Sequence, residues 1–188
     1  MSRVLTPSQT VGPFFHKALL REGGGDLTTR GPAGERIVVE GRVIDGDGAP
    51  VPDAMVEIWQ ANAAGRYDHP EDRQDKPIDP NFSGFGRVGT DSDGWFRFRT
   101  IKPGPVREAG DFTQAPHLNV TVFARGLLRH IVTRIYFPDE ALNASDPVLS
   151  TVPAERRATL IARRAGEPSH YRLDVVLQGD DETVFFDV

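Results

Sequence analysis

The chain has 188 residues, a formal net charge of −5 at pH 7 and 26 % charged residues. This length fits one domain with a sizeable core, and the acidic balance gives no indication of nucleic acid or an anionic membrane as a partner. The absence of cysteine excludes a disulfide scaffold, a cysteine-ligated zinc site and a thiol nucleophile. The segment from Met1 to Thr10 is polar, and no apolar run reaches membrane-span length, so a cytoplasmic protein is expected.

Short alternating segments separated by turn signals indicate an all-β protein. The first runs from Ile37 to Ile44 and places Ile37, Val39 and Val43 on one face. The next strand is expected from Ala54 to Gln60, after a turn rich in aspartate and glycine. Further strands are expected at residues 95–100, 117–124, 129–137, 171–177 and 183–188. This pattern predicts a single domain over residues 1–188 with the fold of an antiparallel β-sandwich.

The segments between these strands are long and irregular. Residues 1–36 predict an N-terminal arm or extension, with an apolar, proline-containing spot from Val11 to Phe15. Long loops are expected at residues 61–90 and 102–116, and loops of that length in a compact domain are usually functional or cover a partner. One or two short helices are expected, the clearest in residues 151–166, where a cap threonine, an early proline and an acidic first turn coincide.

Two motif matches lack the structural context that their chemistry needs. Gly84 to Gly89 reads G-x-G-x-x-G but follows no strand and opens no helix, so it predicts a flexible loop rather than a nucleotide site. The turns that begin at Asp45 and Asp91 resemble fragments of a calcium loop, but neither has glutamate at the twelfth position. Both are better explained as hairpin turns.

His117 and Asn119 stand at the start of an expected strand, two residues apart and therefore on the same face. Two histidines at this spacing would supply half of a metal site, but here one position is asparagine. Tyr67 lies early in the first long loop, and Arg134 lies on the polar side of an otherwise apolar strand. Such an arginine is either a solvated edge residue or a bidentate anchor for a carboxylate or developing negative charge.

Two longer stretches carry a resemblance to a known family. Asp47 to Tyr67, with Glu57-Ile58-Trp59-Gln60 at its centre, resembles the core signature of the intradiol ring-cleavage dioxygenases, and Thr90 to Gly104 continues it. Thr6 to Phe14 and Glu182 to Asp187 extend the resemblance nearly from end to end. The catalytic chains of this family bind a non-haem ferric ion with two tyrosines and two histidines.

The resemblance implies that two of these four ligands are missing here. The positions that match the ligands are Tyr67, Val106, His117 and Asn119. Valine has no donor atom, and a neutral amide oxygen is a poor replacement for an imidazole nitrogen. We therefore expect no metal on this chain, and we expect the Fe(III) to be bound by a partner.

The resemblance also implies which partner that is. In two-chain enzymes of the family, a homologous beta chain carries the iron, and the N-terminal arm and one arginine of the other chain help to line the substrate pocket. The matching positions are Thr10, Gly12, Pro13 and Arg134. The implied reaction is cleavage of 3,4-dihydroxybenzoate by O2 in a hetero-oligomer of such pairs, with Arg134 acting on the substrate or on intermediate charge.

Two other interpretations remain open at this point. A self-sufficient dioxygenase would need the two absent ligands. A non-enzymatic, transthyretin-like β-sandwich that binds or supports another molecule would share the Asp-Gly-x-Pro hairpin and the following strand. The long loops at residues 61–90 and 102–116 argue against that second alternative, because a simple module does not need them.

Overall fold

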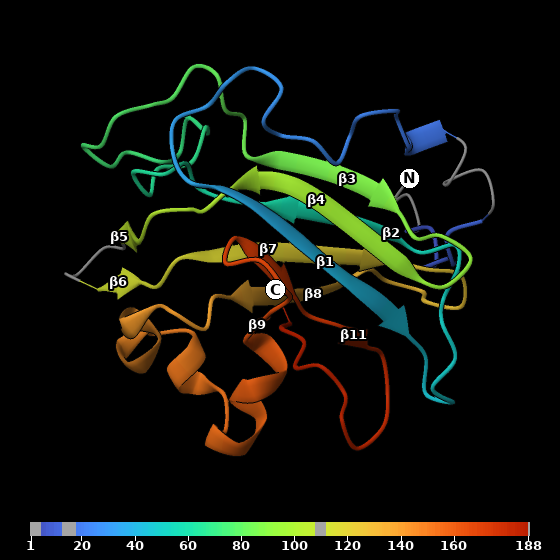
Figure 1. The fold of residues 1–188 in the computed structure, drawn as a ribbon. Coiled ribbons are helices and arrows are strands. Elements are labelled where there is room, and N and C mark those ends of the chain that lie inside the picture. The colour runs from blue at the N-terminus through green and yellow to red at the C-terminus, as the bar shows by residue number, and fades with distance from the viewer. Residues whose placement is uncertain (1–4, 13–17, 108–111, 188) are drawn as a thin grey trace.

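The computed structural model describes residues 5–12, 18–107 and 112–187, and it confirms the β-sandwich (Figure 1). One sheet has β1 at its centre. Strand β4 pairs with β1 in the antiparallel direction on one side, whereas β10 and β11 pair with it in the parallel direction on the other, and β9 extends β10. The strands of this sheet are β1 (Arg36–Ile44), β4 (Trp95–Ile101), β9 (Arg163–Arg164), β10 (His170–Arg172) and β11 (Val175–Val176).

The second sheet is antiparallel throughout, in the order β3-β2-β7-β8. A separate two-stranded ribbon of β5 and β6 stands at one end of it. The strands are β2 (Met55–Trp59), β3 (Phe85–Gly89), β5 (Val106–Arg107), β6 (Thr113–Gln114), β7 (His117–Phe123) and β8 (Ile131–Tyr136). Strand β7 therefore lies between β2 and β8 from Asn119 onward, whereas His117 and Leu118 at its start pair only with β8.

The core lies between the two sheets and confirms the faces that the alternation predicts. Val39 on β1, Phe98 on β4, Ile58 on β2, Val120 on β7 and Ile135 on β8 are all fully buried in one apolar cluster. Each such side chain stabilises the fold by about 1.5–3 kcal/mol relative to an exposed one. The paired faces fix the register of β7, so that His117 and Asn119 cannot exchange faces with the residues between them.

A second, smaller apolar cluster lies outside the sandwich, under three short 3-10 helices. It includes Tyr136 on β8, Leu149 and Leu160. The helices are η1 (Ala141–Ser145), η2 (Leu149–Thr151) and η3 (Ala154–Leu160). The single helix expected through residue 166 is thus wrong in form and length, because Arg163–Arg164 pairs with β10 as a strand. Ala154 and Ala158 of η3 are exposed, whereas Leu160 is buried.

Three strand expectations also need correction. The loop expected over residues 61–90 contains β3, which satisfies the free edge of β2. The strand expected over residues 171–177 is interrupted between β10 and β11, where the Asp174 carboxylate accepts the backbone N–H of Arg42 at 3.0 Å. The expected strand over residues 183–188 is not a strand within the described residues; it contributes one bridge, between Phe186 and Val132.

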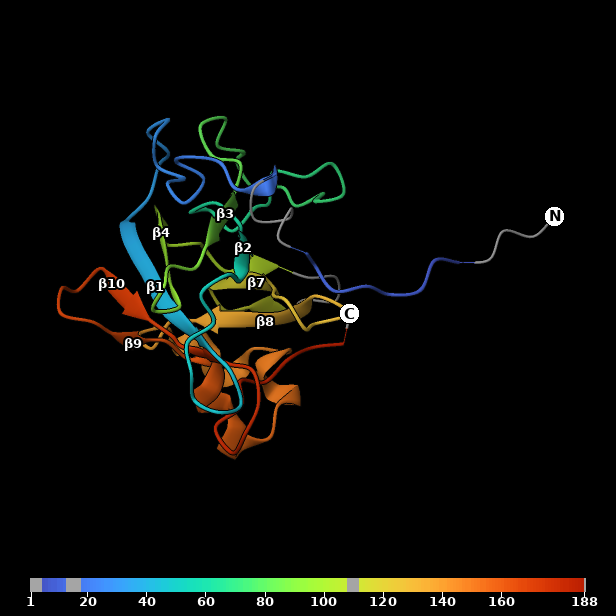
Figure 2. The same ribbon diagram turned by 90° about the vertical axis from the view of Figure 1, so that its right-hand side faces the viewer.

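The expected N-terminal extension divides into two parts. Residues 24–27 pack along the sandwich, where the backbone N–H of Leu27 donates to the carbonyl of Arg99 at 2.9 Å and the N–H of Arg99 donates to Gly25 at 2.8 Å. Residues 5–12 instead pass the turn between β7 and β8, and the part toward the N-terminus then runs away from the body of the molecule (Figure 2), where Leu5 is 91 % exposed. Among the described residues, no helix is long and apolar enough to cross a lipid bilayer.

Candidate functional site

The four positions that match iron ligands lie together at one end of the second sheet. His117 and Asn119 project from β7, Tyr67 follows β2 on the first long loop, and Val106 begins β5. In the sheet, Asn119 lies directly opposite Trp59 on one side and Arg134 on the other. The register of β7 thus brings Arg134 to the same end of the sheet.

His117 is buried, with 2 % of its surface exposed, and its two ring nitrogens have different partners. Nδ1 lies 2.7 Å from the carbonyl oxygen of Ala115, which can only accept, so Nδ1 carries the proton. Nε2 is therefore an acceptor, and it lies 3.2 Å from the hydroxyl oxygen of Tyr67. Burial and the charge of Arg134 lower the pKa of His117 to about 4, so the ring is neutral at pH 7.

Asn119 forms a hydrogen bond with the same hydroxyl group of Tyr67 that contacts His117. Its amide nitrogen donates to the hydroxyl oxygen of Tyr67 at 2.9 Å and to the carbonyl of Trp59 at 3.2 Å. The Tyr67 hydroxyl therefore accepts from Asn119 and donates to His117. Burial raises the pKa of Tyr67, which keeps the phenol protonated at neutral pH. We call Tyr67, His117 and Asn119 with these hydrogen bonds the tyrosine network.

The donor set of these residues does not fit a ferric ion. A ferric site needs lone pairs and anionic oxygens directed at one point. Here only Tyr67 and His117 are side chains of the types that a ferric ion binds well, while Asn119 directs an N–H group at the phenol oxygen. Val106 is 7 % exposed and has no donor atom. Within the described residues, no group of three or more histidine, cysteine, aspartate or glutamate side chains could bind a metal ion.

Arg134 belongs to a second polar chain beside the tyrosine network. Its guanidinium donates to the amide oxygen of Gln114 at 2.8 Å and to the hydroxyl of Tyr136 at 3.3 Å. Tyr136 in turn donates to the carboxylate of Asp146 at 3.1 Å. Asp146 is fully buried and also accepts the backbone N–H of Ala115 at 2.7 Å. This chain of contacts ties Arg134 to the backbone that leads into β7.

Sequence reasoning missed Gln114, Tyr136 and Asp146 as parts of this site. Asp146 accepts the backbone N–H groups of Val148 and Leu149 at 3.0 and 2.7 Å, an arrangement typical of aspartate before a helical turn. The Asp146-Pro147 pair was a signal for that turn. No pattern in the sequence pointed to its contacts with Ala115 and Tyr136, which come from distant segments.

A cavity of about 670 Å³ opens beside Tyr67. The stacked rings of Trp59 and Tyr67, with centroids 5.7 Å apart, form part of its wall. The other lining residues are His69, Glu71, Asp72, Arg73, Gln74, Val106, Arg107 and Gln114. The cavity therefore joins the Tyr67 and Val106 positions, as the resemblance implied, and its wall carries charges of both signs.

The N-terminal arm meets the domain at a different place. The backbone N–H of Gly126, in the turn between β7 and β8, donates to the hydroxyl of Thr10 at 2.7 Å. Gly12 is exposed, with no atom within 4 Å of the place where a Cβ would stand, and Pro13 lies outside the described residues. Within this chain the structure does not bring Thr10 and Arg134 together, because they lie at opposite ends of the β7–β8 hairpin.

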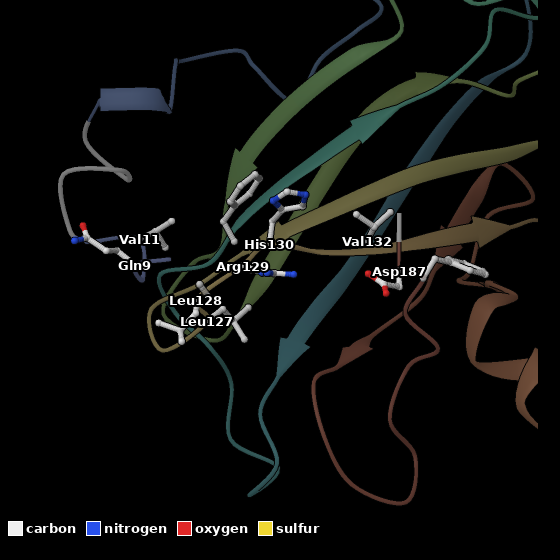
Figure 3. Close-up of a pocket in the computed structure, with 11 residues that line it drawn as sticks. Gln9, Val11, Leu127, Leu128, Arg129, His130, Val132 and Asp187 are labelled. Atoms are coloured by element: carbon white, nitrogen blue, oxygen red, sulfur yellow. The ribbon is translucent and has the colours of Figure 1, made fainter. Parts of the chain in front are cut away.

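A second cavity, of about 500 Å³, lies where the arm passes this hairpin (Figure 3). Gln9 and Val11 of the arm line it together with apolar residues of the β7–β8 turn, among them the exposed Leu128. The remaining lining residues are Phe123, Ala124, Leu127, Arg129, His130, Val132, Phe186 and Asp187. We call this the arm cavity.

Comparison with known proteins gives one consistent result. A family model described as "Dioxygenase" matches residues 11–179. The protocatechuate 3,4-dioxygenase alpha chain of Burkholderia cepacia is 52 % identical over 198 residues, with 97 % of each chain covered. The beta chain of protocatechuate 3,4-dioxygenase from the same organism is 44 % identical over 189 residues, covering 94 % of this chain and 77 % of the relative.

A solved structure agrees on the fold. The dioxygenase domain of a dioxygenase–carbohydrate-binding protein fusion from Streptomyces sp. SirexAA-E matches with a TM-score of 0.62 at 23 % identity, covering 95 % of this chain and all of that one. The sandwich, the clustered ligand positions and these matches together show that the chain belongs to the intradiol ring-cleavage dioxygenase family.

Proposed function

We propose that this chain is the alpha subunit of a protocatechuate 3,4-dioxygenase. With an iron-carrying beta chain it cleaves 3,4-dihydroxybenzoate by O2 to 3-carboxy-cis,cis-muconate. Its similarity to the Burkholderia cepacia alpha chain, over nearly the full length of both, supports this role. The observation that supports an iron-free role is the donor set: Val106 has no donor atom, and Asn119 donates an N–H group to the phenol of Tyr67 where an iron ligand would present a lone pair.

The iron in this proposal belongs to the partner. The beta chain of Burkholderia cepacia is 44 % identical to this chain, so a homologous partner would have the same sandwich and the same end of the sheet available for ligands. Fe(III) on that chain would supply the activation of the dihydroxylated ring toward O2. Our chain contributes shape and charge to the pocket, and several such pairs would assemble into a larger hetero-oligomer.

The arm is the first contribution that we propose. Residues 5–12 leave the body of their own domain (Figure 2), and the hydrogen bond between Gly126 and Thr10 anchors them at the hairpin turn. Among the described residues, nothing lies within 4 Å of the place where a Cβ of Gly12 would stand, so a flat aromatic ring could approach its backbone closely. We propose that Thr10, Gly12 and Pro13 line the substrate pocket on the beta chain.

Arg134 is the second proposed contribution. Its guanidinium has five N–H donors, and only one nitrogen serves Gln114 and Tyr136. The remaining donors are available for a carboxylate of the substrate or for charge that develops on it across the interface. We propose this role in trans. Replacement of Arg134 by alanine in the two-chain enzyme should raise KM or lower kcat, and unchanged kinetics would remove Arg134 from the site. Arg97→Ala, on the exposed face of β4, is the matched control.

The decisive experiment is expression of this chain alone and together with its beta chain. We expect no iron, no tyrosinate-to-iron visible absorption and no O2 uptake with 3,4-dihydroxybenzoate for the single chain, and all three for the pair. Iron and activity in the single chain would show a self-sufficient dioxygenase. Absence of iron and activity from both preparations would instead favour the transthyretin-like module.

A further inference from the structure

The tyrosine network places metal-ligand types close together without a metal. The phenol oxygen of Tyr67 lies 3.2 Å from Nε2 of His117, and the amide nitrogen of Asn119 lies 2.9 Å from the same oxygen. The three side chains therefore converge on one point, from β7 and from the loop after β2. This arrangement is close to that of a metal site with three ligand residues. The difference is Asn119, which presents an N–H group to the phenol where a metal ligand would present a lone pair.

The position of Arg134 adds a positive charge to this point. It lies directly opposite Asn119 in the sheet, and its guanidinium donates to an amide oxygen and a phenol rather than to a carboxylate. Its guanidinium lies 3.3 Å from the hydroxyl oxygen of Tyr136, and the ring of Tyr136 has its centroid 5.8 Å from that of His117, so the positive charge stands close to the tyrosine network. A cation that approached these donors would meet this charge in a half-buried site, where screening by water is weak.

Asn119 and Arg134 oppose a metal in different ways. Asn119 occupies the phenol oxygen with an N–H group and so removes a ligand lone pair. Arg134 places a positive charge here that would oppose a cation whichever donors stand at positions 67, 117 and 119, whereas the Asp146 carboxylate, bonded to Tyr136, acts in the opposite sense. Arg134 is itself fixed, because Gln114 and Tyr136 bind its guanidinium and Asp146 binds Tyr136. The repulsion is thus part of a rigid arrangement.

We propose that Arg134, together with Asn119, excludes metal cations from the Tyr67–His117 end of this chain. The inference rests on the proposed iron-free role and deepens it: the site rejects metal through a built-in positive charge as well as through missing ligands.

The test introduces a third metal-ligating side chain at position 119 and then removes the positive charge at position 134. Asn119→His supplies an imidazole beside Tyr67 and His117, and Asn119→His/Arg134→Gln does so without the positive charge. The control is Asn119→His/Arg97→Gln, since Arg97 is an exposed arginine of β4 that pairs with Glu40 at 3.6 Å. Each purified full chain is titrated with Co²⁺, followed by its visible absorption, and with Zn²⁺ in competition with a chromogenic chelator.

We expect the Arg134→Gln double variant to bind either metal at least about tenfold more tightly than Asn119→His alone. The Arg97→Gln double variant should match Asn119→His. Equal affinities with and without Arg134, or no binding in any variant, would overturn the proposal. Circular dichroism shows whether the Asn119→His variants fold. If they do not, metal affinity is compared with and without Arg134→Gln in Asn119→Asp, which keeps the shape of the native side chain.

These outcomes are separate from those that test the proposed function. The function is tested with the native chain and its beta partner, whereas this device is tested in variants of the single chain. If Arg134 has no effect on metal affinity, the native chain can still be an iron-free subunit. If the native single chain binds iron, both proposals fail.

Discussion

Asn119 donates a hydrogen bond to the hydroxyl of Tyr67 at 2.9 Å, and this contact directs the proton of that hydroxyl toward His117. The result is a chain of hydrogen bonds that runs from the carbonyl of Ala115 through His117, Tyr67 and Asn119 to the carbonyl of Trp59. Such a network stabilises a site when it is complete, and it is costly when one member is removed.

Replacement of Tyr67 by phenylalanine should therefore destabilise the protein. The variant leaves Nε2 of the buried His117 without its donor and Asn119 without one acceptor. We expect a loss of about 1–3 kcal/mol in the free energy of unfolding, measured by urea denaturation. Tyr171→Phe is the control, because the Tyr171 hydroxyl has only long contacts of 3.4 Å with Asp139. An equal loss in both variants would contradict the role of the network.

Acid should weaken the fold through His117. Its pKa is about 4 in the folded protein, below the ordinary histidine value of 6.5, because burial and Arg134 disfavour the charged ring. The stabilisation is complete above pH 6.5 and is lost as the pH falls from 6.5 through about 4; its full size is on the order of 3 kcal/mol. Urea unfolding at pH 7 and pH 4.5 should show this loss in the native chain and a smaller loss in His117→Gln. His130→Gln, at an exposed histidine, should lose as much unfolding free energy between pH 7 and pH 4.5 as the native chain does.

The buried carboxylate of Asp146 should be sensitive to loss of one acceptor oxygen. In Asp146→Asn, an amide N–H group would face either the N–H of Ala115 or that of Leu149, both of which now donate at 2.7 Å. We expect a loss of about 2–3 kcal/mol in thermal or urea unfolding. Asp181→Asn, at an exposed position of the C-terminal turn, should change stability by less than about 0.5 kcal/mol. If the two variants behave alike, Asp146 does not support the entry to β7.

Gly65 fixes the loop that carries Tyr67 against the loop that carries Val106. Its φ is +82°, and a Cβ at this position would stand 1.9 Å from the carbonyl oxygen of Pro105. Gly65→Ala should therefore cost about 3 kcal/mol or more, because the two loops must separate. Gly166→Ala is the control that separates backbone strain from steric clash. The φ of Gly166 is +79°, but among the described residues no atom lies within 4 Å of the new methyl group. That control should cost only about 1–2 kcal/mol, and a similar cost at both positions would show that the loops yield easily.

The two-residue period of the sequence predicts the sandwich and the buried faces of its strands, because one face of each strand must leave water. It could not predict β3, since Phe85–Gly89 contains two glycines and becomes a strand only by pairing with the open edge of β2. It also could not show that Tyr136, on the side of β8 opposite the sandwich core, is buried. That burial depends on the cluster under the 3-10 helices, which come later in the chain.

The candidate site, like the fold, could be predicted only in part from the sequence. The i, i+2 spacing predicts that His117 and Asn119 share a face, and the family resemblance implies Tyr67 and Val106 as their neighbours. The structure brings Tyr67 into hydrogen-bond contact with both residues of β7, and Val106 into the wall of the same cavity. The link from Arg134 through Tyr136 to Asp146 depends on side-chain directions in two separate segments, β8 and the turn after η1, and no local pattern encodes those directions.

The parallel pairing of β1 with β10 and β11 has a consequence for synthesis of the chain. The backbone N–H of Arg42 in β1 is bonded to Asp174, 132 positions later in the sequence. One side of β1 therefore stays unpaired until nearly the whole polypeptide has left the ribosome, and pairing over such a distance is slow because a large loop must close. Aggregation during expression should thus arise from this open edge, and slower growth at low temperature should improve the yield of folded subunit.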